Sequence, residues 1–283
     1  MRPYLLVAAT LAFTACHDNT GPIPRGTVGL GFQVARSSPA SLTAAAFSDG
    51  SSVPGEEPVV TPSAEGLLIT RGEDAIVVTR AQVVVKDVKL ERADATCVDD
   101  DDFDDLSFAD KDKSRGNSKD DDDEDNCPTI HAGPFLVDIP MNGTDGARVI
   151  VPVGEGTYSA VRLSLHKVTS NDSADRAFRQ ANPDFRDISV RLEGTFNGAP
   201  FIFVGDISRK IDVTLPEPLD ISEAGGDVTV TLDLGTWFIR PSGGLYSPAL
   251  ANTPGSVRSV VQNNIGGTFR AFCDHNRDGR EDR

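Results

Sequence analysis

AIVVTRAQVVVKDVKLER, residues 75–92, is a long run with the composition of a β-strand. Its Val and Ile side chains are branched at Cβ, which favours the extended backbone of a strand. Lys86 and Asp87 interrupt the alternation of apolar and polar residues, as the extra residue of a β-bulge does. The run therefore predicts one long strand with a bulge near its middle, and residues 67–70 predict the strand before it.

Shorter runs of the same kind recur along the chain, with turn residues between them. Asn197-Gly198 joins two of these runs and is the dipeptide most typical of a two-residue hairpin turn. The other predicted strands cover residues 28–34, 135–139, 148–153, 157–168, 188–196, 200–204, 207–215, 227–238 and 269–272. Helical signals are limited to a turn near residues 174–180 and a short C-terminal helix at 256–265. The pattern predicts an all-β fold, an antiparallel β-sandwich of the immunoglobulin-like or prealbumin-like kind.

The length of 283 residues allows one large or two small domains. We expect one sandwich over residues 26–272 with two insertions, and two small sandwiches are the alternative. The first insertion, residues 37–66, is rich in Ser, Ala, Pro and Gly, so we expect it to be flexible. The second, residues 93–133, is the acidic loop described next.

The acidic loop carries most of the net charge of the chain. Residues 99–125 contain 14 acidic and four basic residues, so they contribute −10 to a total of −16. Self-repulsion and the lack of apolar side chains to bury predict that this loop is disordered. A chain of this charge repels phosphates, which excludes nucleic acid as a partner.

The N-terminus is typical of an exported lipoprotein. Arg2 precedes an apolar run, residues 4–13, that is too short to span a bilayer but has the length of a signal-peptide core. Cys16 follows, at the position that receives the lipid in such proteins. We expect residues 1–15 to be removed, Cys16 to carry acyl chains such as palmitate, and residues 16–25 to tether the domain to the membrane.

Other interpretations of the N-terminus stay open. A plain secretory signal cleaved near Ala15 would leave Cys16 as an ordinary thiol, and a cytoplasmic chain is the third alternative. Phe13 stands where Leu is usual in lipoprotein signals. His17, rather than Asp, follows Cys16, which favours the outer membrane, on its periplasmic or its surface side, over the inner membrane.

Cys97 and Cys127 flank the acidic loop, and we predict a disulfide between them because exported proteins fold in an oxidising compartment. Such a bond would close a loop of about 30 residues and contribute roughly 3–4 kcal/mol in the chain-entropy model. Cys273 is then the odd thiol, and a pairing that includes Cys273 stays open.

Three segments carry a family resemblance: residues 135–138 (FLVD), 156–163 (GTYSAVRL) and 228–234 (VTVTLDL). In this order, after a lipidation cysteine and a Val-rich strand that ends in a variable loop, they resemble a bacterial envelope lipoprotein family with a domain of unknown function. The resemblance covers roughly residues 26–240, and the acidic loop and the tail after Gly266 are extra to it. It implies a sandwich domain on an envelope lipoprotein and no known activity.

The polar tail, residues 273–283, contains the spacing of a calcium loop, with Gly279 at the turn. Five residues would supply the oxygen ligands: Asp274, Asn276, Asp278, Arg280 (through its carbonyl) and Asp282. The glutamate expected at the twelfth position would fall beyond Arg283, and three arginines reduce the local negative charge. A weak Ca²⁺ site and a solvated tail are both open interpretations.

No catalytic motif stands out: the sequence has no nucleophile elbow, no His-Glu-x-x-His and no phosphate loop. His166 is expected on the solvent face of a strand. Trp237, Phe238 and Tyr246 are candidates for a carbohydrate-binding face, but core or edge packing is the simpler interpretation. We expect a non-enzymatic binding or structural role, with an envelope protein or a glycan as partner. A carbohydrate-binding accessory lipoprotein and an uncharacterised enzyme are the alternatives.

Overall fold

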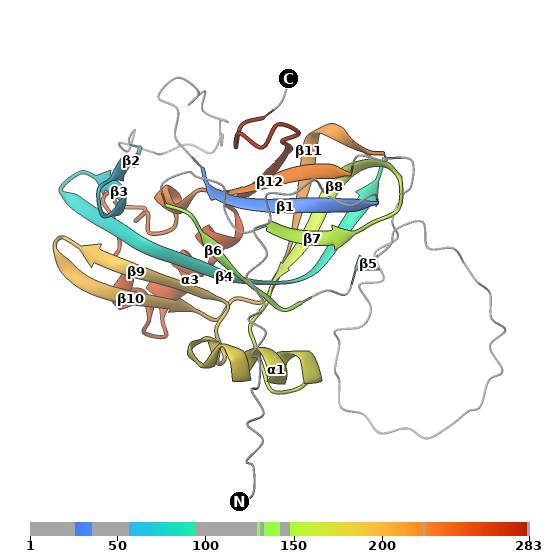
Figure 1. Ribbon diagram of the computed structural model, residues 1–283. Helices are drawn as coiled ribbons and strands as arrows, with labels where there is room; N and C mark the ends of the chain where they lie inside the picture. Colours follow the sequence, from blue (N-terminus) through green and yellow to red (C-terminus); the bar gives the residue numbers. More distant parts are fainter. Residues whose placement is uncertain are drawn as a thin grey trace, which may run out of the picture.

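A computed structural model describes residues 26–35, 57–93, 129–130, 133–141, 148–222 and 225–281 of the chain. These residues form two β-sheets and a few short helices (Figure 1). The strands are β1 (Thr27–Val34), β2 (Val59–Ser63), β3 (Gly66–Arg71), β4 (Asp74–Arg92), β5 (Thr129–Ile130), β6 (Phe135–Ile139), β7 (Arg148–Pro152), β8 (Gly156–Leu165), β9 (Val190–Phe196), β10 (Ala199–Gly205), β11 (Arg209–Ile221), β12 (Gly226–Leu232) and β13 (Phe269–Cys273). The helical elements are α1 (Ser173–Ala181), α2 (Pro248–Ala251), α3 (Ser256–Gly266) and the 3₁₀ turns η2 (Pro183–Phe185) and η3 (Leu234–Thr236).

Strand β4 organises the nine-stranded sheet. One edge of β4 pairs in turn with β3, β6 and β5, and the other edge pairs with β9 and then with β8. The sheet continues to β10 beyond β9, to β2 beyond β3 and to β11 beyond β8. The predicted long strand at residues 75–92 and its predecessor at 67–70 are therefore confirmed.

The predicted bulge at Lys86 and Asp87 is also present. The register of β4 against β8 shifts after Lys86, and Asp87 has a φ of 51°. The shift lets Val85 and Val88, which are an odd number of residues apart, both lie in the core, where neither is exposed. Val84 lies on the opposite face of β4, and the alternation of side chains along a strand places Lys86 there as well.

The four-stranded sheet has the order β13-β12-β1-β7. Strand β1 pairs in parallel with β12, from Val28 opposite Gly226 to Val34 opposite Leu232, and antiparallel with β7. The antiparallel pairing predicted for the sandwich does not hold at the β1–β12 pair. These two strands are separated by most of the chain, so no turn between them fixes their relative direction.

The two sheets share one continuous apolar core. It contains Val28 and Leu30 from the four-stranded sheet and Leu163 and Leu192 from the nine-stranded sheet. Most pairings are antiparallel and helices are few, so the described part of the chain is β-rich and sandwich-like. Burying alternate residues of both inner faces against each other is the usual way in which two sheets form one core.

Helix α1 covers the outer face of β4, away from the four-stranded sheet (Figure 1). Phe178 of α1 and Phe185 of η2 contact each other edge to face at 6.4 Å between ring centroids, and they pack on Val84. Asp172 caps the helix by accepting a hydrogen bond from the Asp175 N–H at 2.7 Å. The sequence predicts only a helical turn here, and the helix is longer because it has this second apolar cluster to cover.

The hairpin and the C-terminal helix also follow the sequence. Asn197 and Gly198 have φ values of 49° and 81°, and they connect β9 to its partner β10. Helix α3 covers the predicted residues 256–265 and one more.

Other segments differ from the sequence-based prediction. The strand expected over residues 227–238 ends at Leu232, because Asp233 begins the turn η3. Residues 59–63, inside the predicted flexible insertion, form β2 at the edge of the large sheet. Thr129 and Ile130, at the end of the predicted acidic loop, pair with β4.

Candidate functional site

A surface groove of about 470 Å³ lies between η3, helix α3 and the start of β13. Its volume is within the range of small-molecule sites, roughly 300–1,000 Å³. Three segments that are separate in the sequence supply its walls: the chain after β12, helix α3 and the loop into β13. The side chains that determine its chemistry are Asp233, Thr236, Ile239, Pro241, Asn263 and Arg270.

The position of Asp233 follows from the way strand β12 ends. The Asp233 carboxylate accepts a hydrogen bond from the Gly235 N–H at 3.0 Å and so caps η3. The Thr236 hydroxyl donates to the Asp233 carbonyl at 3.0 Å, and the Asp233 N–H donates to the Thr268 carbonyl. These contacts hold the Asp233 side chain at the wall of the groove.

Trp237 connects the η3 side of the groove to the α3 side. Its side chain is fully buried, and its indole N–H donates to the Thr268 hydroxyl at 2.9 Å. The Thr268 hydroxyl donates in turn to the Ile265 carbonyl, and the Asn264 amide donates to the Trp237 carbonyl at 3.2 Å. Because these bonds link η3 to α3 and β13, the groove is formed before any ligand arrives.

The burial of Trp237 bears on the proposed carbohydrate-binding face. Trp237 and Phe238 are both buried, and Phe238 packs edge to face against Phe203 with ring centroids 5.3 Å apart. Tyr246 is half-buried against the same core. Core packing, the simpler interpretation of these aromatic residues, is therefore confirmed, and Trp237 offers no exposed ring for a sugar.

Helix α3 is fixed to the large sheet by Arg258. Its guanidinium forms an ion pair with Asp206 and donates to the carbonyl oxygens of Val204 and Ala251. Burial by itself raises the pKa of Asp206, but the hydrogen bond and charge of Arg258 outweigh it, so that the pKa lies below its ordinary value. The ionised pair keeps α3, and with it one wall of the groove, in place.

The electrostatics of the groove centre on Asp233 and Arg270. Burial raises the pKa of the Asp233 carboxyl, and the negative charge of Glu57 acts in the same direction. The Gly235 N–H and the charge of Arg270 oppose this without cancelling it. Arg270 and Asn263 are both exposed, and within the described residues neither side chain has a hydrogen bond or an ion pair. The groove therefore combines an acid, Asp233, whose negative charge is only partly balanced, with two hydrogen-bond donors, Asn263 and Arg270, that have no partner among the described residues.

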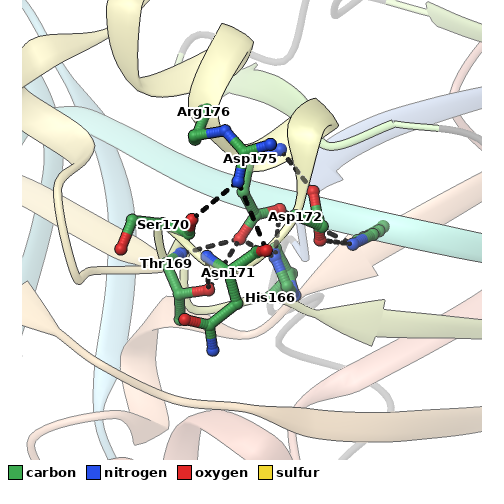
Figure 2. A network of polar contacts seen from close by, with 8 residues as sticks. His166, Thr169, Ser170, Asn171, Asp172, Asp175 and Arg176 are labelled. Atoms are coloured by element: carbon green, nitrogen blue, oxygen red, sulfur yellow. Dashed lines mark hydrogen bonds and ion pairs between the residues drawn. The ribbon is translucent and has the colours of Figure 1, made fainter.

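A second polar cluster lies at the start of α1 (Figure 2). The Asp175 carboxylate is fully buried and accepts from His166 Nε2 at 2.8 Å and from the Thr169 N–H at 2.7 Å. Lys86 Nζ lies 3.5 Å from Asp175 and donates to Asp172 at 2.9 Å. Lys86 takes part because it follows Val84 by two residues in β4 and so lies on the face that α1 covers.

The charges in this cluster stabilise one another. Burial alone would raise the pKa of Asp175, but the Thr169 N–H, His166 and Lys86 lower it below its ordinary value. The hydrogen bond from the Asp175 N–H, followed by that from Lys86, lowers the pKa of Asp172. Burial would lower the pKa of Lys86, yet the two aspartates raise it overall. The cluster is thus an ionised, internally satisfied network.

The prediction for His166 is wrong. The residue lies just after the end of β8, and its ring faces Asp175 rather than solvent (Figure 2). A His–Asp pair is one part of the machinery that activates a nucleophile, which also needs a hydroxyl or thiol bonded to the histidine. Among the described residues no such group is bonded to His166, and the nearby Ser170 is exposed and contributes its carbonyl to Arg176. The arrangement fastens α1 to β4.

Some of the predicted site residues lie outside the described residues. Cys16, Cys97, Cys127 and Asp282 belong to this group, so the lipidation site, the disulfide and the last calcium ligand stay predictions. Cys273 is described: it is buried at the end of β13, and its sulfur lies 3.4 Å from the Glu217 carbonyl oxygen.

The tail after β13 is folded against the four-stranded sheet. Asp274 is buried, and its carboxylate accepts from the Thr229 hydroxyl at 2.7 Å and from the Asp278 and Gly279 N–H groups at 3.0 Å. The Gln33 amide donates to the Gly279 carbonyl at 2.7 Å. The tail is therefore docked on the sheet through Asp274 and Gly279, while His275, Asn276, Asp278, Arg280 and Glu281 are exposed to solvent.

Four of the five predicted calcium ligands, Asp274, Asn276, Asp278 and Arg280, come together in this single turn. The side-chain oxygens of Asp274, Asn276 and Asp278 accept hydrogen bonds from backbone N–H groups of the turn itself, and the Arg280 N–H is the donor to Asp278. In the part of the chain that the structure describes, no three His, Cys, Asp or Glu side chains are grouped closely enough to hold a metal ion. Calcium binding stays a prediction.

The chain matches no protein-family model, no curated protein and no solved structure. Among the described helices, none has the length and apolar character needed to cross a membrane. The assignment of a function therefore depends on the geometry of the groove and on the sequence features of the N-terminus.

No sequence motif marks Asp233, Asn263 and Arg270 as residues of one site. They come from a strand end, a helix and a later strand, and only the fold brings them together. One signal was available for Asp233: an aspartate two residues before a glycine at the end of an apolar strand is a typical turn cap.

Proposed function

We propose that the protein is a lipid-anchored envelope lipoprotein whose β-sandwich binds a small ligand in the groove and catalyses no reaction. The observation that supports this most is the groove itself, which is held open by buried bonds and lined by Asp233, Asn263 and Arg270. The immunoglobulin-like or prealbumin-like type of sandwich and the resemblance to the envelope lipoprotein family belong to the same proposal.

The anchor is supported by the N-terminal sequence and is compatible with the position of β1. Strand β1 begins at Thr27, about 11 residues after Cys16. A fully extended segment of this length reaches at most ~40 Å. A lipid on Cys16 would thus keep the start of β1 within about 40 Å of the membrane surface. Two or more acyl chains hold a protein stably on a bilayer, whereas one does not.

The anchor is tested by the mass of the mature N-terminus and by detergent phase partitioning of the full chain made in a Gram-negative host. We expect a diacylglyceryl group on Cys16 as the first residue, and recovery in the detergent phase. Cys16→Ala should appear in the aqueous phase. An unmodified thiol at Cys16, or a mature chain that starts elsewhere, would show plain secretion instead.

Ligand binding is tested by hydrogen exchange of the full chain with and without a small-molecule extract of the bacterial envelope. We expect slower exchange of the amides around Asp233 and in α3, because a bound ligand suppresses local opening there. The β9–β10 hairpin at Asn197, outside the groove, is the internal reference. If no extract fraction slows exchange at the groove more than it slows exchange in the hairpin, the groove is rejected as a binding site.

A carbohydrate-binding role has less support. Stacking on sugars requires an exposed aromatic face, and Trp237, the strongest candidate for it, is fully buried. The groove lining is dominated by charged, amide and aliphatic groups.

A further inference from the structure

The chemistry of the groove restricts the class of ligand that it fits. Asp233 is an acid in a partly desolvated position, and the N–H of Gly235 is the hydrogen-bond donor that the turn supplies to it. A cationic group on a ligand would compensate its charge more fully than water does, because opposite charges attract more strongly where water is excluded. A net charge of −16 on the chain also favours the approach of a cationic group over an anionic one.

Arg270 and Asn263 add a second requirement. The Arg270 guanidinium has five donors in a planar fork, the geometry that pairs with a carboxylate through two parallel bonds. Within the described residues it has no ion pair of its own, although its charge reaches Asp233. Asn263 places on the same groove an amide that has no hydrogen-bond partner among the described residues. A ligand with only a positive charge would be repelled by Arg270, so a carboxylate close to the cationic group fits better.

The third requirement is an apolar group on the ligand. Ile239, Pro241 and Val260 line the groove beside the polar groups. A volume of about 470 Å³ has room for a short aliphatic side chain together with the charged groups. A sugar would leave these aliphatic groups without a matching surface.

We propose that the groove binds a zwitterionic α-amino acid with an aliphatic side chain. The ammonium group faces Asp233, the carboxylate faces Arg270 and Asn263, and the side chain packs on Ile239 and Val260. This proposal rests on the proposed function, because it names the ligand class of the same groove.

The test is isothermal titration of the full chain with L-leucine as the probe. Isopentylamine has the same side chain and amine without the carboxylate, and 4-methylpentanoate has the acid without the amine. We expect L-leucine to bind one to one and both single-charge analogues to bind at least tenfold more weakly. Glucose tests the sugar alternative and is expected to give no heat beyond dilution.

Variants assign the roles of the two charged residues. Asp233→Asn keeps the cap on Gly235, and Arg270→Gln keeps a hydrogen-bond donor, so both should fold. We expect each to weaken L-leucine binding at least tenfold. Asp220→Asn and Arg186→Gln are matched controls on exposed residues outside the groove and should bind like the unaltered chain.

Each result has a separate meaning. No heat with L-leucine, undiminished binding by Asp233→Asn, or equal binding of isopentylamine would overturn the amino-acid proposal. If that happens while an envelope extract still slows exchange at the groove, the ligand class is wrong and the proposed function stands. If no extract fraction slows exchange, both are rejected.

Discussion

The carboxylate of Asp175 connects β4, the end of β8 and the first turn of α1 through Lys86, His166 and Thr169. We expect Asp175→Ala to lower the free energy of unfolding by about 2–4 kcal/mol, because it leaves His166 and the Thr169 N–H without their acceptor and removes one of the two carboxylates beside Lys86. Denaturant unfolding measures the loss. The control is Asp184→Ala, whose ion pair is mostly exposed and should contribute little; equal losses in the two variants would contradict a special role for the buried network.

Asp175 also predicts a pH dependence. Its pKa is below the ordinary value of 3.8, so the ionised carboxylate stabilises the folded state above that pH. This contribution is lost as the pH falls through the lower, folded-state pKa. We expect the free energy of unfolding to decrease on acidification below about pH 4, and to decrease less steeply in Asp175→Asn. Parallel pH profiles for the two chains would mean that another group dominates the acid sensitivity.

Asp233 predicts the opposite sign. Burial raises its pKa, so ionisation near neutral pH destabilises the folded state, and stability falls as the pH rises through the folded-state pKa. Asp233→Asn should therefore raise the melting temperature slightly at pH 7, and the difference should shrink at a pH below about 4. Thermal unfolding at the two pH values measures this. Asp233→Asn would then raise stability and weaken ligand binding. This trade-off between stability and activity is expected of a residue in a functional site.

Strands β4 and β9 leave no room for a side chain at Gly194. A Cβ atom on Gly194 would overlap the backbone carbonyl of Val77, because the register of β4 shifts between Val78 and Arg80. We expect Gly194→Ala to cost about 2–3 kcal/mol, since backbone atoms cannot move aside as a side chain can. Circular dichroism melting measures it, with Ala199→Gly in the neighbouring strand as a control of small effect. An unchanged melting temperature would show that the bulge relaxes.

Elements that depend on nearby residues could be predicted from the sequence. The bulge in β4 was visible because Lys86 and Asp87 break a local alternation, and the β9–β10 hairpin because Asn197-Gly198 adopts positive φ readily. The parallel pairing of β1 with β12 was not visible, because it joins strands at opposite ends of the chain. The same holds for the groove: Asp233 and Arg270 have no shared sequence pattern, and their neighbourhood is created by tertiary contacts.

On the scale of the whole molecule, the C-terminal tail completes the four-stranded sheet. Asp227 and Thr229 of β12 lie on the face away from the core and are nevertheless buried, because the tail covers them. Arg277 donates to Asp227 at 2.9 Å, and Asp274 accepts from Thr229. Arg148 of β7 pairs with the other oxygen of Asp227, so the tail, β12 and the edge strand share one ionic contact.

A chain that ends at Cys273 should therefore be less stable by about 2–3 kcal/mol, roughly 5 °C in melting temperature, because Asp227 loses one partner and Thr229 loses its acceptor. Asp274→Ala should reproduce most of this loss, whereas Arg280→Ala, which keeps every backbone bond of the turn, should not. Equal stability of the shortened and the full chain would contradict docking of the tail.

Calcium binding by the tail is tested in the same experiment. A ligand that binds only the folded tail raises the melting temperature of the full chain and leaves that of the shortened chain unchanged. Identical melting temperatures in Ca²⁺ and in chelator would show that the tail binds no calcium. The tail would then stabilise the fold through its own hydrogen bonds and ion pair.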